Sequence, residues 1–197
     1  MGKIILVTGG ARSGKSTFAE SELKEKKSVC YIATSVITFP DPEMEQRVLL
    51  HKRQRPASWM TEERFLQVGD FLKQNNHYSA YLIDCVTILT TNLFYYLLGQ
   101  QFGDDYQKID EQINQFTEVQ KLEIEAKLKK EWIDITKAIH MIPADVILVT
   151  NEVGLGIVPE SKLSRWFRDI LGRINQQLGK EADDVYFVVC GIPTKIK

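Results

Sequence analysis

The sequence predicts an α/β fold in which helices cover both faces of a mainly parallel sheet. Apolar runs of strand length recur along the chain with helix-like stretches between them, and this alternation is typical of parallel sheets. The first run leads into a glycine-rich motif that opens a helix, as in P-loop nucleotide-binding proteins. Of the 197 residues 44% are apolar, and the chain has no repeat or linker, so we expect one domain over residues 1–197.

Each expected element has its own local pattern. Strands are expected where apolar runs reach strand length, at 3–8, 29–34, 80–84, 145–150 and 185–190. Asp-Pro-Glu at 41–43 predicts a helix start, because aspartate caps a first turn and proline fits within it. The stretch 104–142 has neither glycine nor proline, which predicts one or two long helices with a solvated, charged face. Helical spacing of apolar residues predicts another helix over 161–180, while Lys195 and Lys197 are interpreted as a solvated tail.

Composition excludes several classes of protein. The formal net charge of -1 argues against nucleic acid as the principal partner. No apolar run approaches the length of a membrane span, and the short run at the N-terminus passes directly into the glycine-rich motif, unlike a signal peptide. The 3 cysteines show no C-x-x-C spacing, which indicates reduced, mostly buried thiols. We therefore expect a soluble cytoplasmic protein.

The glycine-rich motif is the most specific local signal in the chain. Residues 9–16 read G-G-A-R-S-G-K-S, which matches G-x-x-x-x-G-K-[ST] between a strand and a helix. In such a loop the backbone N–H groups surround phosphates, Lys15 reaches the β and γ oxygens, and Ser16 can bind Mg²⁺. An ordinary glycine-rich turn is the alternative, but the match and its context favour a nucleoside triphosphate site. This motif specifies the fold further, as a P-loop NTPase-like (RecA-like) fold.

A P-loop also needs an acidic group to hold Mg²⁺ from the opposite side, normally at the end of a neighbouring buried strand. Asp84 follows the apolar residues 81–83 and has this form. The alternative is that Asp84 caps a helix beginning near Thr87. We favour the metal-binding interpretation.

A cationic segment forms the second unusual feature. On a helix starting at Pro42, the side chains of Arg47, His51 and Arg55 would share one face. A histidine among cations could act as acid or base, or attack phosphorus itself. From spacing alone, a half-buried structural histidine is the favoured interpretation. The polar, glycine-containing stretch 151–159 follows the fourth strand, where α/β proteins bind ligands, and is interpreted as a substrate loop rather than a plain connection.

Together these motifs resemble the bifunctional adenosylcobinamide kinase / adenosylcobinamide-phosphate guanylyltransferase family. The resemblance runs nearly end to end. It rests on the phosphate motif, Y-I-A-T-S at 31–35, H-K-x-x-R-P at 51–56 and N-E-V-G-x-G-I-V-P at 151–159. It implies two reactions: phosphate passes from ATP or GTP to adenosylcobinamide, and GMP then passes from GTP through an enzyme histidine to the cobinamide phosphate. It also implies a homo-oligomer, with a trimer as the candidate form.

The resemblance also assigns roles to individual residues. It makes His51 the guanylylated histidine and so reverses the preference drawn from spacing, while Lys15 contributes to catalysis and Ser16 and Asp84 hold Mg²⁺. The implied nucleotide-binding residues are Gly9, Gly10, Ala11, Arg12, Ser13, Gly14, Lys15, Ser16, Thr34, Ser35, Val36, Lys52, Arg53, Gln54, Arg55, Glu63 and Asp84.

Two departures and two rival functions remain at this stage. Leu50 stands where family members often carry a first histidine, and the stretch 104–142 is longer and more charged than the family pattern. One rival is another P-loop small-molecule kinase without nucleotidyl transfer. The other is a GTP-dependent switch, against which Asp84 is followed by Cys-Val-Thr rather than by D-x-x-G, and N-K-x-D is absent from the sequence.

Overall fold

The computed structural model describes residues 2–35, 55–103, 109 and 113–197. Their strands form one sheet in the order β3-β2-β4-β5-β1-β6-β7. All pairings are parallel except that of β6 with β7, which is antiparallel. The strands are β1 (Ile4–Gly9), β2 (Val29–Ala33), β3 (Met60–Glu63), β4 (Ala80–Asp84), β5 (Asp145–Val149), β6 (Asp184–Val189) and β7 (Ile192–Lys195).

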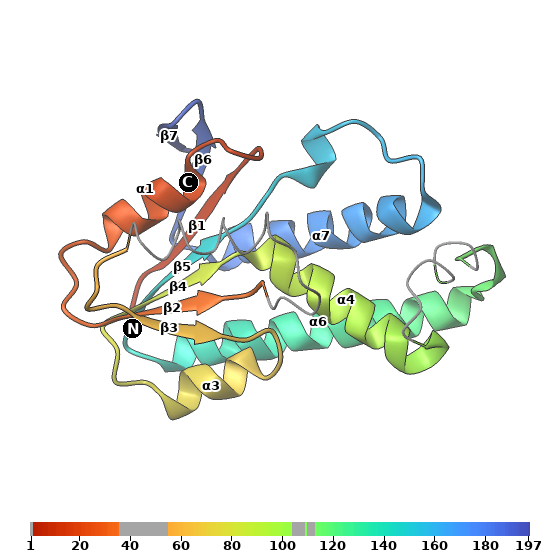
Figure 1. The fold of residues 1–197 in the computed structure, drawn as a ribbon, viewed down its shortest axis with the longest axis horizontal. Helices are drawn as coiled ribbons and strands as arrows, with labels where there is room; N and C mark the ends of the chain where they lie inside the picture. The colour runs from red at the N-terminus through yellow and green to blue at the C-terminus, as the bar shows by residue number, and fades with distance from the viewer. Residues whose placement is uncertain (1, 36–54, 104–108, 110–112) are drawn as a thin grey trace.

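Helices cover both faces of the sheet (Figure 1). One face packs against α3, α4, α6 and α7, and the other packs against α1. The helices are α1 (Lys15–Glu22), α3 (Val68–Gln74), α4 (Val86–Phe102), α6 (Glu118–Met141) and α7 (Lys162–Glu181), with short 3₁₀ turns η1 (Ile113–Gln115) and η2 (Val153–Leu155). The expected fold, a mainly parallel sheet with helices on both faces, is confirmed.

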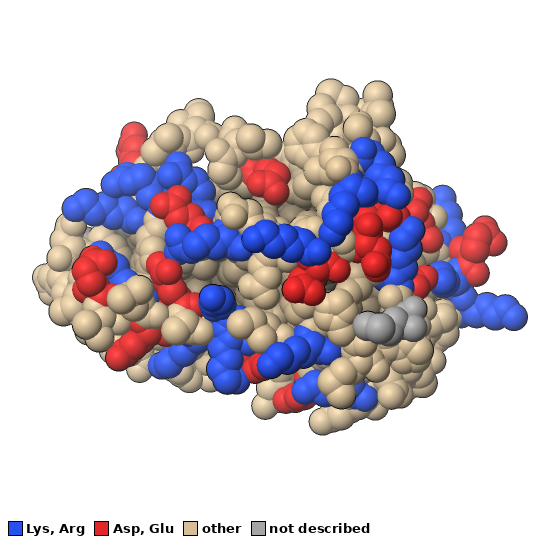
Figure 2. Space-filling view, turned by 180° about the vertical axis from the view of Figure 1, so that it is seen from behind, with Lys and Arg blue, Asp and Glu red and all other residues tan. Residues whose placement is uncertain are grey.

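The surface carries charges of both signs. On the face shown in Figure 2, lysine and arginine side chains lie interspersed with aspartate and glutamate, as the formal net charge of -1 leads one to expect. Within the described part of the chain, no helix is long and apolar enough to cross a membrane.

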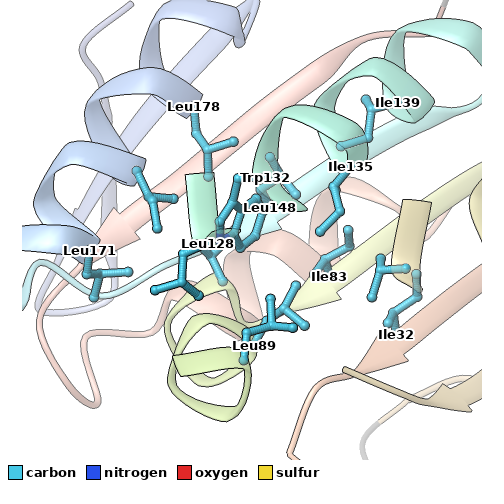
Figure 3. Packing of buried hydrophobic residues seen from close by; sticks show 14 of the residues in the cluster. Ile32, Ile83, Leu89, Leu128, Trp132, Ile135, Ile139, Leu148, Leu171 and Leu178 are labelled. Atoms are coloured by element: carbon cyan, nitrogen blue, oxygen red, sulfur yellow. The ribbon is translucent and has the colours of Figure 1, made fainter. Parts of the chain in front are cut away.

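The core is built by strands that are buried on both faces. Along β1, Ile4 and Leu6 face the α6–α7 side, while Ile5 and Val7 face the α1 side. This alternation is why parallel strands read as continuous apolar runs in the sequence. The larger cluster is centred on Trp132 of α6, which is fully buried (Figure 3), and its indole N–H donates a hydrogen bond to Thr90 Oγ1 of α4 at 3.0 Å.

The helix boundaries follow from capping. Ser161 caps α7 by accepting a hydrogen bond from the Ser164 N–H at 3.2 Å. Thr117 and Gln120 form a reciprocal capping box at the start of α6. Gly103 ends α4 with a φ of 88°, a backbone conformation that glycine adopts readily. The helix predicted over 161–180 is confirmed, and the described part of the stretch 104–142 contains the long helix α6.

The structure departs from the sequence-based expectations at the sheet edges and at the C-terminal lysines. The edge strands β3 and β7 were not expected from the sequence, and the residues of β7 are all exposed. The C-terminal lysines are not a solvated tail, because Lys195 belongs to β7 and pairs with Asp184 at 2.8 Å. Lys197 Nζ donates to three carbonyl groups at the end of α7, those of Gly179, Lys180 and Ala182. The helix predicted to start at 41–43 lies outside the described residues.

Candidate functional site

The phosphate motif forms a loop between β1 and α1. Its backbone has positive φ at Gly9 (152°), Arg12 (55°) and Gly14 (95°). Left-handed residues of this kind turn successive N–H groups toward a common centre, which suits an anion. A Cβ on Gly14 would approach the Cα of Gly191 to 3.1 Å, so the close packing of the loop requires glycine there.

Lys15 lies within this loop. Lys15 is only 7% exposed, and its Nζ donates a hydrogen bond to the carbonyl oxygen of Gly10 at 2.6 Å. Burial lowers the pKa of Lys15, and the nearby side chains of Cys85 and Asp84 oppose that shift. The ammonium group therefore lies inside the loop, within the electrostatic influence of the end of β4.

The other loop residues divide into buried and exposed. Ser13 Oγ is buried and has no hydrogen-bond partner among the described residues, which is rare for a buried hydroxyl and leaves it able to bind a ligand oxygen. Ser16 is half-buried in the first turn of α1, whereas Gly10, Ala11 and Arg12 are exposed.

A hairpin supports the loop from one side. Cys190 and Gly191 connect β6 to β7 with φ values of 52° and 78°, as a two-residue type I′ turn requires. The Gly191 N–H donates to the Ser13 carbonyl oxygen at 2.8 Å. Sequence analysis missed this contact, although a glycine directly after an apolar strand was the available signal.

Asp84 stands at the end of β4, but not on the strand next to the phosphate loop. β5 lies between β1 and β4, so the expectation of a neighbouring strand is wrong. The capping alternative is also wrong, because the N-cap of α4 is Cys85, whose Sγ accepts from the Ile88 N–H at 3.4 Å. The Asp84 carboxylate instead accepts a hydrogen bond from the Tyr31 hydroxyl at 2.9 Å.

The segment after β2 is fixed to the β4–α4 connection. The buried Thr34 hydroxyl donates to the Cys85 carbonyl oxygen at 2.9 Å and accepts from the Cys85 N–H at 2.8 Å. The Thr34 carbonyl oxygen accepts from Asn92 Nδ2 at 2.7 Å. Thr34 thus holds the backbone in place, and the half-buried Ser35 follows it. Glu63 is exposed at the end of β3.

Arg55 occupies a bend rather than the helix face expected for it. Its guanidinium carbon lies 3.5 Å from the centroid of the Tyr31 ring, and its Nε lies 3.8 Å from Glu20 Oε1 of α1. The Arg55 side chain is 6% exposed. The remaining predicted residues, Val36, His51, Lys52, Arg53 and Gln54, lie outside the described residues.

The stretch after β5 adjoins the phosphate loop. The Glu152 N–H donates to the Gly9 carbonyl oxygen at 3.2 Å, and Glu152 Oε1 accepts from Thr8 Oγ1 at 2.9 Å. Asn151 is held through its N–H, which donates to Thr87 Oγ1 at 2.9 Å. Sequence analysis placed this stretch at the ligand-binding edge but did not single out Glu152, because the insertion of β5 beside β1 could not be foreseen.

These residues fit a magnesium-bound triphosphate. The loop offers N–H groups, a buried ammonium and an unpartnered hydroxyl, while Ser16 and Asp84 offer the oxygen ligands that Mg²⁺ prefers. Among the residues that the structure describes, no cluster of three or more His, Cys, Asp or Glu side chains forms a metal site of the protein alone.

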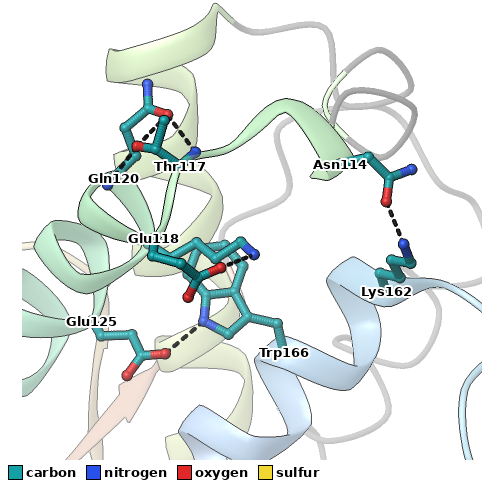
Figure 4. Close-up of polar contacts among 8 residues, drawn as sticks. Asn114, Thr117, Glu118, Gln120, Glu125, Lys162 and Trp166 are labelled. Carbon is teal, nitrogen blue, oxygen red and sulfur yellow. Dashed lines mark hydrogen bonds and ion pairs between the residues drawn. The ribbon is translucent and has the colours of Figure 1, made fainter.

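Two hollows lie between α6 and α7, away from the phosphate loop. One, of about 550 Å³, is lined by residues that include Leu122, Lys129 and Arg173. The other, of about 560 Å³, lies near the start of both helices (Figure 4). There Trp166 Nε1 donates to Glu125 at 2.6 Å, and Lys162 donates to Asn114. Neither hollow is lined by a predicted site residue.

Comparisons with known proteins agree with the resemblance. Residues 5–196 match the family described as "Cobinamide kinase / cobinamide phosphate guanyltransferase". The chain is 45% identical over 197 residues to the "Bifunctional adenosylcobalamin biosynthesis protein CobU" of Escherichia coli strain K12, covering 98% of this chain and 99% of that protein. It is 43% identical to the protein of the same name from Salmonella typhimurium, with the same coverage. A Pseudomonas aeruginosa relative named CobP is 35% identical, covering 98% of this chain and 96% of the relative.

Among solved structures, the chain is similar to one titled "Crystal structure of the RadB recombinase". The TM-score is 0.46 and the identity 14%, covering 94% of this chain and 73% of that chain.

Proposed function

The chain belongs to the cobinamide kinase / cobinamide phosphate guanyltransferase family, and from this premise we propose that it carries out both reactions at one nucleotide site. In the first, the γ-phosphate of ATP or GTP passes to the hydroxyl of adenosylcobinamide. In the second, His51 attacks the α-phosphate of GTP, pyrophosphate leaves, and the cobinamide phosphate takes the GMP to give adenosylcobinamide-GDP.

The described residues support the phosphate-binding part of this proposal. The observation that carries it is the phosphate loop, with the buried Lys15 ammonium held inside it 2.6 Å from the Gly10 carbonyl oxygen. The loop N–H groups and Lys15 would neutralise charge on the non-bridging oxygens, which is the main contribution that phosphoryl transfer needs from a protein. Mg²⁺, held by Ser16 and Asp84, would supply further charge neutralisation.

The second reaction is tested by labelling the protein with GTP that carries the label on its α-phosphate. We expect one covalent label, stable to base and lost in acid, that disappears in a His51→Ala variant. GTP labelled on the γ-phosphate should leave the protein unlabelled. His77→Ala is the matched control and should retain the label. The His77 ring lies tilted against the Tyr78 ring, with ring centroids 4.2 Å apart.

The labelling experiment, run beside assays of adenosylcobinamide phosphorylation and of nucleotide-dependent partner binding, separates the rival functions. A protein that phosphorylates adenosylcobinamide but takes no α-phosphate label is a P-loop kinase only. A protein that does neither, yet binds a partner according to its nucleotide state, is a regulatory switch.

We also propose a cytoplasmic homo-oligomer, with a trimer as the form to be tested by analytical ultracentrifugation. No nucleic-acid partner is proposed, in keeping with the formal net charge of -1.

A further inference from the structure

A row of four side chains in contact leads from α1 to the end of β4. Glu20 faces Arg55 with 3.8 Å between Oε1 and Nε. The Arg55 guanidinium covers the Tyr31 ring at 3.5 Å, and the Tyr31 hydroxyl donates to Asp84 Oδ2 at 2.9 Å. Glu20 follows Ser16 by one helical turn on α1. The row therefore runs from the neighbourhood of Ser16 to Asp84, the two proposed Mg²⁺ ligands.

Glu20 is an unfavourable choice for stability alone. Its side chain is 14% exposed, and its Oε1 has no hydrogen-bond partner among the described residues. Burial raises the pKa of Glu20, and Arg55 only partly opposes the shift, while Asp84 adds to it. A buried carboxylate without full hydrogen bonding costs stability, so the position of Glu20 beside Arg55 points to a role in the site.

The Tyr31 hydroxyl is suited to donate a hydrogen bond rather than to accept one. The residue is 5% exposed, and its hydroxyl, protonated at neutral pH as a phenol ordinarily is, donates to Asp84 Oδ2 at 2.9 Å. A cation over the ring face draws electron density away from the phenol, which strengthens the hydroxyl as a hydrogen-bond donor. The Arg55 cation therefore reinforces the bond from Tyr31 to Asp84.

We propose that Glu20 and Tyr31 are positioning residues of the phosphate-transfer site, Glu20 holding Arg55 on the Tyr31 ring and Tyr31 orienting the Asp84 carboxylate toward the phosphate loop. This inference rests on the proposed function of Asp84 as a magnesium ligand. It assigns Arg55 a place in this row in addition to the nucleotide contact that the family resemblance implies.

The first test is Tyr31→Phe, which removes one oxygen atom and retains the ring beneath Arg55. GTP affinity is measured by calorimetry in EDTA and in Mg²⁺. We expect the affinity in EDTA to stay within about twofold of the wild type, while the gain in affinity on adding Mg²⁺ falls about tenfold, as for loss of a hydrogen bond to a charged group. The control is Tyr78→Phe, which should match the wild type; the Tyr78 ring meets the Tyr81 ring edge to face, with ring centroids 5.6 Å apart.

If Tyr31→Phe loses GTP affinity equally in EDTA and in Mg²⁺, or loses none in either, the proposed role of Tyr31 is overturned. Asp84→Asn, measured alongside, separates this outcome from failure of the proposed function. If Asp84→Asn leaves the magnesium-dependent gain intact, Asp84 is not a magnesium ligand and the proposed function of that residue fails first.

The second test compares Glu20→Gln with Glu22→Gln, an exposed position on the same helix. Because ionisation of Glu20 is unfavourable in the fold, we expect Glu20→Gln to keep or raise the Tm while the magnesium-dependent gain in GTP affinity falls several-fold. Glu22→Gln should change neither quantity. A lower Tm with affinity lost equally in EDTA and Mg²⁺ would show that Glu20 serves only the fold and would refute its role here.

Discussion

At the scale of single residues, Lys15 is the side chain whose removal we expect to lower activity with the least effect on the stability of the fold. It is buried, and its hydrogen bond within the described residues goes to its own loop. Its burial lowers the pKa of the ammonium group, so the charge is retained at a cost to the fold. These properties are what we expect of a residue that contributes to the transition state rather than to packing, as we propose for Lys15.

We therefore expect Lys15→Ala to lower kcat/KM of the kinase reaction by at least about a hundredfold, because the variant lacks the preorganised positive charge that would neutralise the transferring phosphate. The Tm should change little. Steady-state kinetics with adenosylcobinamide and a thermal unfolding curve measure the two effects. Near wild-type turnover would show that phosphate is held elsewhere.

The three cysteines differ in burial and therefore in the reactivity of their thiols. Burial raises the pKa of Cys30 to about 12 and that of Cys85 to about 11, whereas Cys190 is exposed in the hairpin turn beside the phosphate loop. Only thiolates react with disulfide reagents. At pH 8 an aromatic disulfide reagent should thus react rapidly with one thiol per folded chain, and Cys190→Ser should abolish that phase. Rapid reaction of two or three thiols in the native protein would contradict this.

At the scale of elements, the phosphate loop and the β6–β7 hairpin form one unit. Gly14 has a φ of +95°, and a Cβ there would meet the Gly191 Cα at 3.1 Å. Gly14→Ala should therefore distort the loop and weaken GTP binding at least about tenfold, since a left-handed alanine alone costs about 1–2 kcal/mol. Calorimetry measures the binding. Gly172→Ala, at a position in α7 with no atom within 4 Å of the added Cβ, should bind GTP normally and serves as the control.

Sequence patterns predicted the elements that are buried on both faces and missed those that are not. The strands β1, β2, β4, β5 and β6 read as apolar runs because helices cover both sides of the sheet. β3 and β7 stand at the edges and are largely exposed, so polar residues such as Thr61 and Thr194 obscure their pattern.

At the scale of the whole molecule, strand order decides which predicted residues meet. The motif at 9–16 fixed the phosphate loop, and Asp84 was placed correctly at the end of a strand. The insertion of β5 between β1 and β4 depends on long-range pairing, which local patterns do not encode. For that reason the contacts of Glu152 with Thr8 and Gly9 could not be predicted.

The same sheet brings distant charges together at its other end, and this should shape the response of the whole fold to acid. Lys195 of β7 and Lys3, just before β1, pair with Asp184 of β6 and hold the pKa of its carboxyl below the usual value. A carboxyl whose pKa is lower in the folded than in the unfolded state stabilises the fold above the unfolded pKa, about 3.9. That stabilisation is lost as the pH falls through the folded value.

Asp184→Asn should accordingly show a smaller drop in the free energy of unfolding between pH 6 and pH 3 than the wild type, because asparagine has no proton to take up. Urea unfolding at pH 6, 4 and 3 measures the drop. Asp169→Asn, which removes an exposed carboxylate paired with its neighbour Arg168 at 3.2 Å, should keep the wild-type dependence on pH. If both variants keep it, the lysine pairs of Asp184 do not link the three strands energetically, and the acid response must arise from other carboxylates.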